Sequence, residues 1–216
     1  MGAKRVTIRR IGKLPLLHVT SEDRTRLAMT FVRMQEWYES ANPDFFGKVF
    51  TLDEYKKWYA NEHEGKFSYA NDWSGFNVPS TAVHIVLKKF PGHSEEEESL
   101  FKMLEQLGVL RKKRFYLIGS RDANPRVLAH EFRHALYFCI QGYRQEVDQV
   151  LGQFPVLSLR MRLRRMGYGK SVIDDEIQAW ALTGWPGKLR ISAEMRRMKH
   201  ALKKVEKKYL HLLPPH

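Results

Sequence analysis

The sequence predicts an α+β fold, in which a small mixed sheet packs on one motif-bearing helix and a mainly helical C-terminal part follows. Three observations lead to this prediction. Short apolar runs bounded by glycine or proline indicate strands in the N-terminal half. Apolar residues at helical spacing fill several longer segments. One of these segments, residues 124–142, carries His-Glu-Phe-Arg-His at positions 130–134.

Turn residues and capping residues predict the boundaries of the N-terminal elements. Residues 4–19 contain two short apolar runs split by turn residues, which is typical of two short strands or of a hairpin. Helical spacing predicts a helix from Ser21 to about Ser40, and a Thr-Leu-Asp-Glu capping box opens a helix over 51–62. Residues 65–80 are rich in aromatic and turn residues and read as a loop, either a functional lid or an ordered surface loop.

The middle of the chain is predicted to alternate strand and helix. Ala82 to Leu87 reads as a buried strand, and Arg114 to Ile118 reads as a second one. Between them, Ser94-Glu-Glu-Glu97 is a capping box that opens a helix ending at Gly108. We therefore expect a parallel strand–helix–strand unit directly before the motif.

The C-terminal part is predicted to be mainly helical. Residues 143–151 suit a helix, and 157–164 alternate apolar and polar, which favours a strand with an arginine face although a short helix also fits. Another capping box at 171–174 opens a helix through about Leu182, and Ser192 caps a last helix to about Leu210.

We expect three regions that together form one compact unit. Residues 1–80 form an N-terminal helical and strand region with the aromatic loop. Residues 81–142 form a catalytic α/β lobe with the His-Glu-x-x-His helix. Residues 143–216 form a basic helical lobe. The apolar content of 43% in 216 residues is enough for a globular core.

The motif helix is well bounded in the sequence. Asn124 suits the N-cap, Pro125 the first helical position, and Gly142 the C-terminal stop. His130 and His134 lie one turn and about 40° apart, so both rings can reach one ion. Glu131 lies about 100° from His130, where it could reach a metal-activated water molecule.

The motif is specific for a chain of this composition. Chance predicts about 0.03 such matches. The alternative is a pair of core histidines hydrogen-bonded to neighbours. The opposite side of the helix is apolar and should face a core; it carries Leu128, Phe132, Ala135, Leu136, Cys139 and Ile140.

A catalytic zinc ion usually takes three protein ligands. No histidine lies between His134 and His200, and no cysteine lies upstream of the motif. The nearby carboxylates are Glu146, Asp148, Asp174, Asp175 and Glu176. Glu176 falls in an apolar helix face, where an unpaired carboxylate would be costly, so we predict it as the third ligand. The alternative is that an arginine pairs with Glu176, and Asp175 could orient a ligand histidine.

These two motifs, His130-Glu-Phe-Arg-His134 and Asp175-Glu-Ile-Gln-Ala179, resemble those of gluzincin metallopeptidases, and the short chain resembles the minimal members called minigluzincins. The resemblance implies a zincin-like fold and a third glutamate ligand on a later helix. Gluzincins often carry an acidic residue four positions after that glutamate. Here the position is Trp180, so the supporting role of that acidic residue either falls to another residue or is missing.

The leading hypothesis is a zinc-dependent metallopeptidase acting on a peptide or protein substrate. His130, His134 and Glu176 would hold one Zn²⁺ per chain, and Glu131 would be the general base. Tyr143, Tyr168 or an arginine could stabilise the oxyanion, and Tyr168, just before the Glu176 helix, is preferred.

The net charge of the chain supports functional hypotheses other than the leading one. Net charge is +13, and from Pro155 onward there are 14 Lys/Arg against 5 Asp/Glu. Such a surface is either simply solvated or attracts nucleic acid or another acidic partner. The protein could thus be nucleic-acid-associated with a structural or regulatory metal, or a latent metallopeptidase blocked by the 65–80 loop or the C-terminal tail.

The expected setting is the cytoplasm. One cysteine, Cys139, rules out a disulfide framework within the chain and suits a reducing compartment. The N-terminus lacks an apolar signal core, and no run approaches the length of a membrane span.

Overall fold

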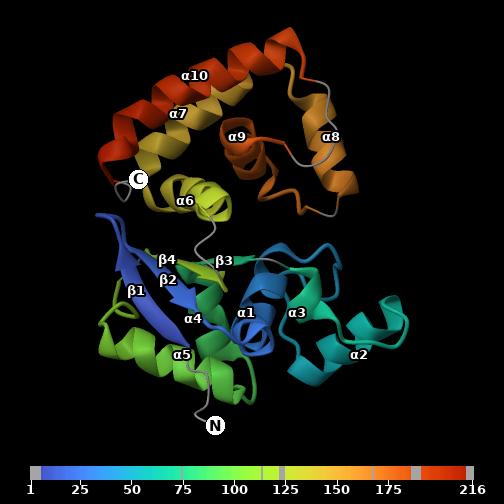
Figure 1. Cartoon of the computed structure of the whole chain (residues 1–216). Coiled ribbons are helices and arrows are strands. Elements are labelled where there is room, and N and C mark those ends of the chain that lie inside the picture. The colour runs from blue at the N-terminus through green and yellow to red at the C-terminus, as the bar shows by residue number, and fades with distance from the viewer. Residues whose placement is uncertain are drawn as a thin grey trace. The chain divides into compact units, whose positions relative to one another are not determined.

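The computed structural model describes residues 6–73, 75–112, 114–121, 125–166, 168–185 and 191–212. The chain forms two compact units, shown with their elements in Figure 1. The first unit consists of residues 1–10 and 15–123, and the second of residues 11–14 and 124–216. The predicted α+β class is confirmed, with helices dominating and one small mixed sheet.

The sheet belongs to the first unit and the motif helix to the second, so each is described by itself. The packing of the sheet on that helix stays a prediction, as does the division into 1–80, 81–142 and 143–216. None of the helices within the described ranges is long and apolar enough to cross a membrane.

Four strands of the first unit form the sheet, in the order β1-β2-β4-β3. They are β1 (Thr7–Ile11), β2 (Leu16–Thr20), β3 (Gly75–Pro79) and β4 (Tyr116–Ser120). The central strand β4 pairs in parallel with β2 and antiparallel with β3. The two strands expected within residues 4–19 and the strand expected near residue 116 are therefore present.

The helices of the first unit are α1 (Arg24–Glu39), α2 (Leu52–Glu62), α3 (Tyr69–Asp72), α4 (Ser80–Lys89) and α5 (Glu95–Gln106). Both capping boxes predicted here are confirmed: Thr51 with Glu54 opens α2, and Ser94 with Glu97 opens α5. Helix α1 begins later than predicted, because Asp23 is its N-cap and accepts the Arg26 N–H.

Two predictions in this unit are wrong. Residues 82–87 lie in helix α4, because the fully buried residues Ala82, Val83 and Val86 follow helical and not strand spacing. Residues 65–80 are not simply a loop, since they contain α3 and the edge strand β3. The parallel pair is consequently β2 with β4, and not two strands flanking α5.

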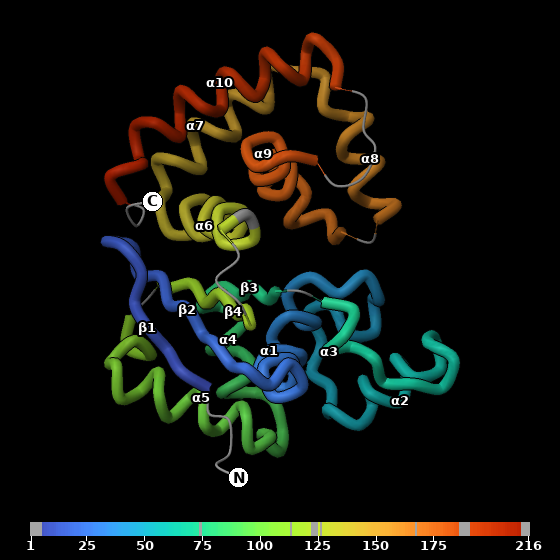
Figure 2. The backbone as a smooth tube through the Cα atoms, viewed as in Figure 1, coloured from blue at the N-terminus to red at the C-terminus, as the bar shows by residue number. Residues whose placement is uncertain are grey.

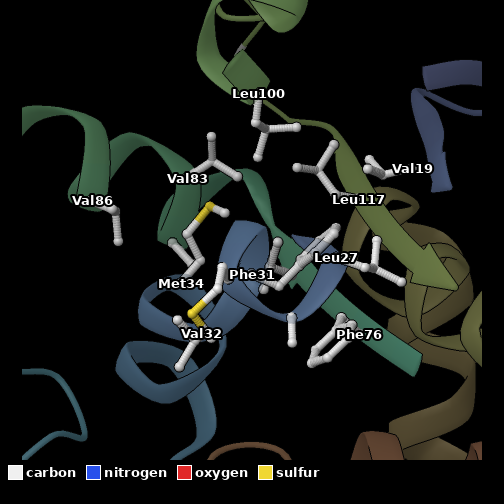
Figure 3. Packing of buried hydrophobic residues seen from close by; sticks show 14 of the residues in the cluster. Val19, Leu27, Phe31, Val32, Met34, Phe76, Val83, Val86, Leu100 and Leu117 are labelled. Carbon is white, nitrogen blue, oxygen red and sulfur yellow. The ribbon is translucent and has the colours of Figure 1, made fainter. Parts of the chain in front are cut away.

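The core of the first unit lies between α1 and the sheet (Figure 3). The ring of Phe31 on α1 stacks on Phe76 of β3, with centroids 5.4 Å apart. Position 119 of β4 must be glycine for this packing, because a Cβ atom there would lie 2.5 Å from the Phe31 ring. The close approach of helix and strand thus depends on one missing side chain.

The second unit contains α6 (Pro125–Cys139), α7 (Gln141–Gly152), α8 (Leu157–Arg165), α9 (Ile173–Thr183) and α10 (Ala193–Tyr209), and a short 3₁₀ turn (Leu210–Leu212). Helix α9 contacts α6, α7, α8 and α10, so it is the centre of this unit. Figure 2 shows α7 and α10 running side by side.

The segment 157–164 is a helix, so the favoured strand is wrong. Apolar residues recur every second position, but only Leu159 and Leu163, four apart, are buried. Leu157 and Met161 are exposed. A pattern of alternate apolar residues includes an i, i+4 pair, which is why it also fits a helix.

Several helix ends differ from expectation. Helix α6 ends at Cys139, and Gly142 lies inside α7. Helix α9 starts after Val172 without a side-chain cap, so the capping box at 171–174 is wrong. Gly184, with φ of 116°, ends α9, and Ser192 caps α10 as predicted. The predicted N-cap Asn124 lies outside the described residues.

Candidate metal centre

The three residues predicted as metal ligands come together in the second unit. His130 and His134 lie on α6 and Glu176 lies on α9, and their ligand atoms are all within 4.8 Å of one another. The two Nε2 atoms are 3.1 Å apart. Glu176 places Oε1 3.5 Å from His134 Nε2 and Oε2 3.7 Å from His130 Nε2. This group could hold a metal ion.

Hydrophobic packing places the two helices so that these side chains meet. On α6, the predicted apolar side is buried at Leu128, Phe132, Ala135 and Leu136, whereas Cys139 is only half-buried. On α9, Ile173 and Ile177 are buried next to Glu176. The ligands expose at most 9% of their surface, so bulk water cannot satisfy them.

A hydrogen bond from α9 sets the tautomer of His130. The Thr183 hydroxyl donates to the Ala179 carbonyl at 2.7 Å, so its oxygen is left to accept. The Nδ1 atom of His130 lies 3.2 Å from that oxygen and is therefore the protonated nitrogen. The Nε2 atom then carries a lone pair that faces the ligand group.

A relay of polar side chains sets the tautomer of His134. Its Nδ1 lies 3.0 Å from Oδ1 of Asp175, which accepts the N–H. The same Oδ1 accepts from the Gln178 amide nitrogen at 2.9 Å, and the Gln178 amide oxygen accepts from the Tyr143 hydroxyl at 2.8 Å. The direction of this relay leaves Nε2 of His134 free to bind an ion.

These contacts test whether the residues fit a metal. Two Nε2 lone pairs at 3.1 Å repel unless a cation or a proton lies between them. Within the described chain, Glu176 Oε2 is buried beside them without a hydrogen-bond partner. Ligands about 2.1 Å from a tetrahedral zinc ion are about 3.4 Å apart, close to the observed spacings. The donor set therefore fits.

The electrostatics of the group are those of an anion-rich site. Burial lowers the pKa of His134, but the carboxylates of Asp175 and Glu176 outweigh it and raise that pKa well above its ordinary value. Burial raises the pKa of the Glu131 carboxyl, while His134 and His130 act in the opposite direction. A bound cation would relieve the excess of negative charge.

Two more polar atoms beside the ligands have no hydrogen-bond partner in the described ranges: Glu131 Oε2 and Trp180 Nε1. The Trp180 ring packs on His130 with centroids 4.1 Å apart. Buried polar atoms normally have partners, so a free acceptor and a free donor at one site indicate a place for a bound molecule.

Other predicted candidates have different roles. Tyr143 cannot stabilise an oxyanion from its observed position, because it is fully buried and its hydroxyl donates to Gln178. Tyr168 is half-buried, and its role stays a prediction. The remaining nearby carboxylates bind elsewhere: Glu146 to Lys208 and Tyr209, Asp148 to Tyr137, and Asp174 to Arg160.

Thr183 is the supporting residue that the sequence reading missed. A signal was available, since Glu176, Trp180 and Thr183 recur every three or four residues and share one face of α9. Two side chains of α9 thus lie behind the predicted ligands, Thr183 behind His130 and Asp175 behind His134.

Comparison of the chain with protein-family models, with curated proteins and with solved structures found no match.

Proposed function

We propose that the protein is a zinc-dependent metallopeptidase of the zincin type. The observation that carries the proposal is the convergence of the Nε2 atoms of His130 and His134, 3.1 Å apart, with the buried carboxylate of Glu176, whose Oε2 has no hydrogen-bond partner among the described residues. Two imidazoles and a carboxylate suit Zn²⁺ better than Mg²⁺ or Ca²⁺, which prefer oxygen ligands. The resemblance to gluzincins, based on the two motifs, supports the same ligand set.

The residues of the site divide the work of peptide hydrolysis. A bound zinc ion supplies a Lewis acid that polarises the scissile carbonyl and increases the acidity of water. Glu131 accepts the proton of the attacking water and passes it to the leaving amine. Burial raises the pKa of the Glu131 carboxyl, and a cation bound by the neighbouring ligands would act in the opposite direction.

Trp180 is suited to contact the substrate. Its indole N–H is a hydrogen-bond donor without a partner, beside a ligand histidine. A peptide carbonyl would satisfy it. We assign Trp180 to holding the substrate carbonyl, with Tyr168 as the other candidate from the sequence.

Metal content tests the first part of the proposal. The purified protein should contain about one zinc per chain by elemental mass spectrometry, in keeping with one three-residue site. His134→Ala and Glu176→Gln should both lose it while keeping the helical circular dichroism spectrum. Wild-type protein that takes up no zinc at neutral pH, even when supplied with excess zinc, would overturn the proposal.

Peptide cleavage tests the second part. Glu131→Gln should retain the metal but lose about 10²- to 10⁴-fold in the rate of cleavage of a peptide library, because the general base is absent. Trp180→Phe should keep the metal and raise KM or lower kcat. If the zinc-loaded wild type cleaves no peptide in the library, the proposed peptidase activity is rejected and the metal site is structural.

A further inference from the structure

We propose that the groove between α8 and the first turn of α10 is a docking site for a peptide segment that combines apolar side chains with aspartate or glutamate. The site is distinct from the metal centre and does not depend on the proposed peptidase activity. Both of its walls belong to the second unit.

The groove has the size and floor of a binding site. Its volume is about 620 Å³, within the range typical of ligand pockets. Apolar side chains form most of it, among them Phe154, Val156, Leu159, Met195 and Met198. Methionine side chains are flexible and polarisable, so such a floor adapts to apolar side chains of different shapes.

Two arginines on the groove are available to a ligand. Arg162 and Arg165 line it, and neither guanidinium group has a hydrogen-bond or ion-pair partner among the described residues. Their neighbour Arg160 differs, since it is held by Asp174 at 2.8 Å. Glu194, the one carboxylate among the described residues that line the groove, pairs with Arg197 at 3.1 Å. The groove therefore keeps an excess of positive charge.

The exposed face of α8 extends the apolar surface beyond the groove. Leu157 and Met161, one turn apart, are 68% and 47% exposed. Burying side chains of this size normally stabilises a helix, so their exposure beside an apolar groove indicates a surface that a partner covers. Arg164 and Arg165 lie on either side of this pair around the helix.

These features select an acidic, amphipathic peptide over a nucleic acid. Proteins that bind single strands stack bases on several aromatic rings, whereas Phe154 is the one aromatic residue among the described residues that line the groove. The aliphatic and thioether floor instead fits leucine or phenylalanine side chains. The arginines fit carboxylates, which guanidinium groups can bind in a bidentate manner. Grooves with this anatomy accept the apolar face of a helix.

The test uses a fluorescein-labelled synthetic peptide about three helical turns long, with leucines at i, i+3, i+4 and i+7 and glutamates between them. Fluorescence anisotropy measures its binding to the full chain. Arg162→Glu/Arg165→Glu should weaken binding about tenfold or more, through loss of two rim charges and their reversal. Met195→Ser should also weaken it.

The matched control is Lys203→Glu/Lys204→Glu, which makes the same change in net charge at two exposed positions of α10 away from the groove. It should change the affinity less than about twofold. Equal loss in both double variants would show attraction to net charge and overturn the site. Displacement of the peptide by single-stranded oligonucleotide, or no binding by the wild type, would overturn it too. Zinc content should be unchanged in all three variants. Loss of peptide binding can then be distinguished from a failure of the metal centre.

Discussion

Arg33 in the first unit and Glu176 in the second are both charged and almost fully buried, but their surroundings differ. Arg33 donates to both carboxylate oxygens of Glu97, and to the carbonyls of Pro91 and Gly92 at 3.0 and 3.1 Å. Glu97 accepts in addition from the Ser94 N–H at 2.9 Å. Glu176 has an oxygen without a hydrogen-bond partner among the described residues, and its carboxylate lies 3.5–3.7 Å from the Nε2 atoms of two histidines.

The same contrast holds for the buried histidines. His18 on β2 lies between the Arg9 guanidinium, 3.3 Å from Nδ1, and the Ser120 hydroxyl, 2.7 Å from Nε2. Burial, together with the positive charge of Arg9, lowers the pKa of His18 to about 4, so His18 is neutral at pH 7. Both of its ring nitrogens have partners within the chain. His134 instead has its pKa raised and one nitrogen directed at other ligand atoms.

This comparison separates two kinds of buried polar group. Where the chain itself supplies every partner, the group serves stability and position. Where the described residues leave one atom of a metal-ligating group without a partner, as at Glu176, an ion from outside the chain could supply it. Four substitution or titration experiments test this distinction.

The largest effect is expected at Arg33. Arg33→Leu should lower the free energy of unfolding by about 3–5 kcal/mol, because it leaves the Glu97 carboxylate buried without its ion pair. Urea denaturation measures the change. Arg10→Leu, at an exposed arginine with one bond to the Leu107 carbonyl, should cost less than about 0.5 kcal/mol. Similar losses of unfolding free energy in both variants would contradict the role assigned to the buried Arg33–Glu97 ion pair.

The pH dependence of stability tests His18. Its folded-state pKa of about 4 is below the unfolded value of 6.5, so the unfolded chain binds more protons in between. The stability from neutral His18 is therefore complete above pH 6.5 and lost as the pH falls towards 4, by about 3 kcal/mol. Urea denaturation of His18→Gln should show a flatter pH profile than the wild type over this window, and an equally steep profile would refute the assignment.

Zinc addition tests the group formed by His130, His134 and Glu176. At a free zinc concentration about 100-fold above Kd, the wild type should gain about 2.7 kcal/mol, seen as a rise in Tm. Glu176→Gln should gain much less at the same concentration. Arg33→Leu should gain as much as the wild type, since its cluster contains no ligand. A gain in Glu176→Gln equal to that of the wild type would remove Glu176 from the site.

The smallest effect is expected at Thr183. Thr183→Val removes the oxygen that holds His130 Nδ1 and should weaken zinc binding about 10- to 100-fold, measured by competition with a chelator. Thr30→Val is a matched control, because Thr30 also donates to the carbonyl four residues before it but is hydrogen-bonded to no histidine of the described chain. Unchanged zinc affinity in Thr183→Val would show that the hydrogen bond does not support the ligand.

Spacing within one helix was the most reliable guide in the sequence. The pair His130 and His134, and the carboxylate at 176 in an apolar face, follow from helical geometry alone, and both capping boxes before residue 100 are present. Contacts between helices were not accessible in this way. Which side chain lies behind each histidine depends on how α9 packs on α6, so Thr183 was missed and Asp175 remained one option.

The errors in secondary structure share one physical cause. Ala82 to Leu87 and residues 157–164 are short segments whose apolar residues satisfy strand and helix patterns together. Tertiary packing decides between them, through burial of Val83 and Val86 in one case and of Leu159 and Leu163 in the other. A short sequence pattern does not determine which residues are buried. A capping box, in contrast, depends only on residues that are close in the sequence.

The relay from Tyr143 through Gln178 and Asp175 connects three helices. Each member has a fixed polarity: the hydroxyl donates, the amide accepts and donates in turn, and the carboxylate accepts. Because the Asp175 carboxylate only accepts, it makes Nδ1 of His134 the donor, and Gln178 and Tyr143 hold that carboxylate in place. The orientation of a histidine on α6 thus depends, through two side chains of α9, on a tyrosine of α7.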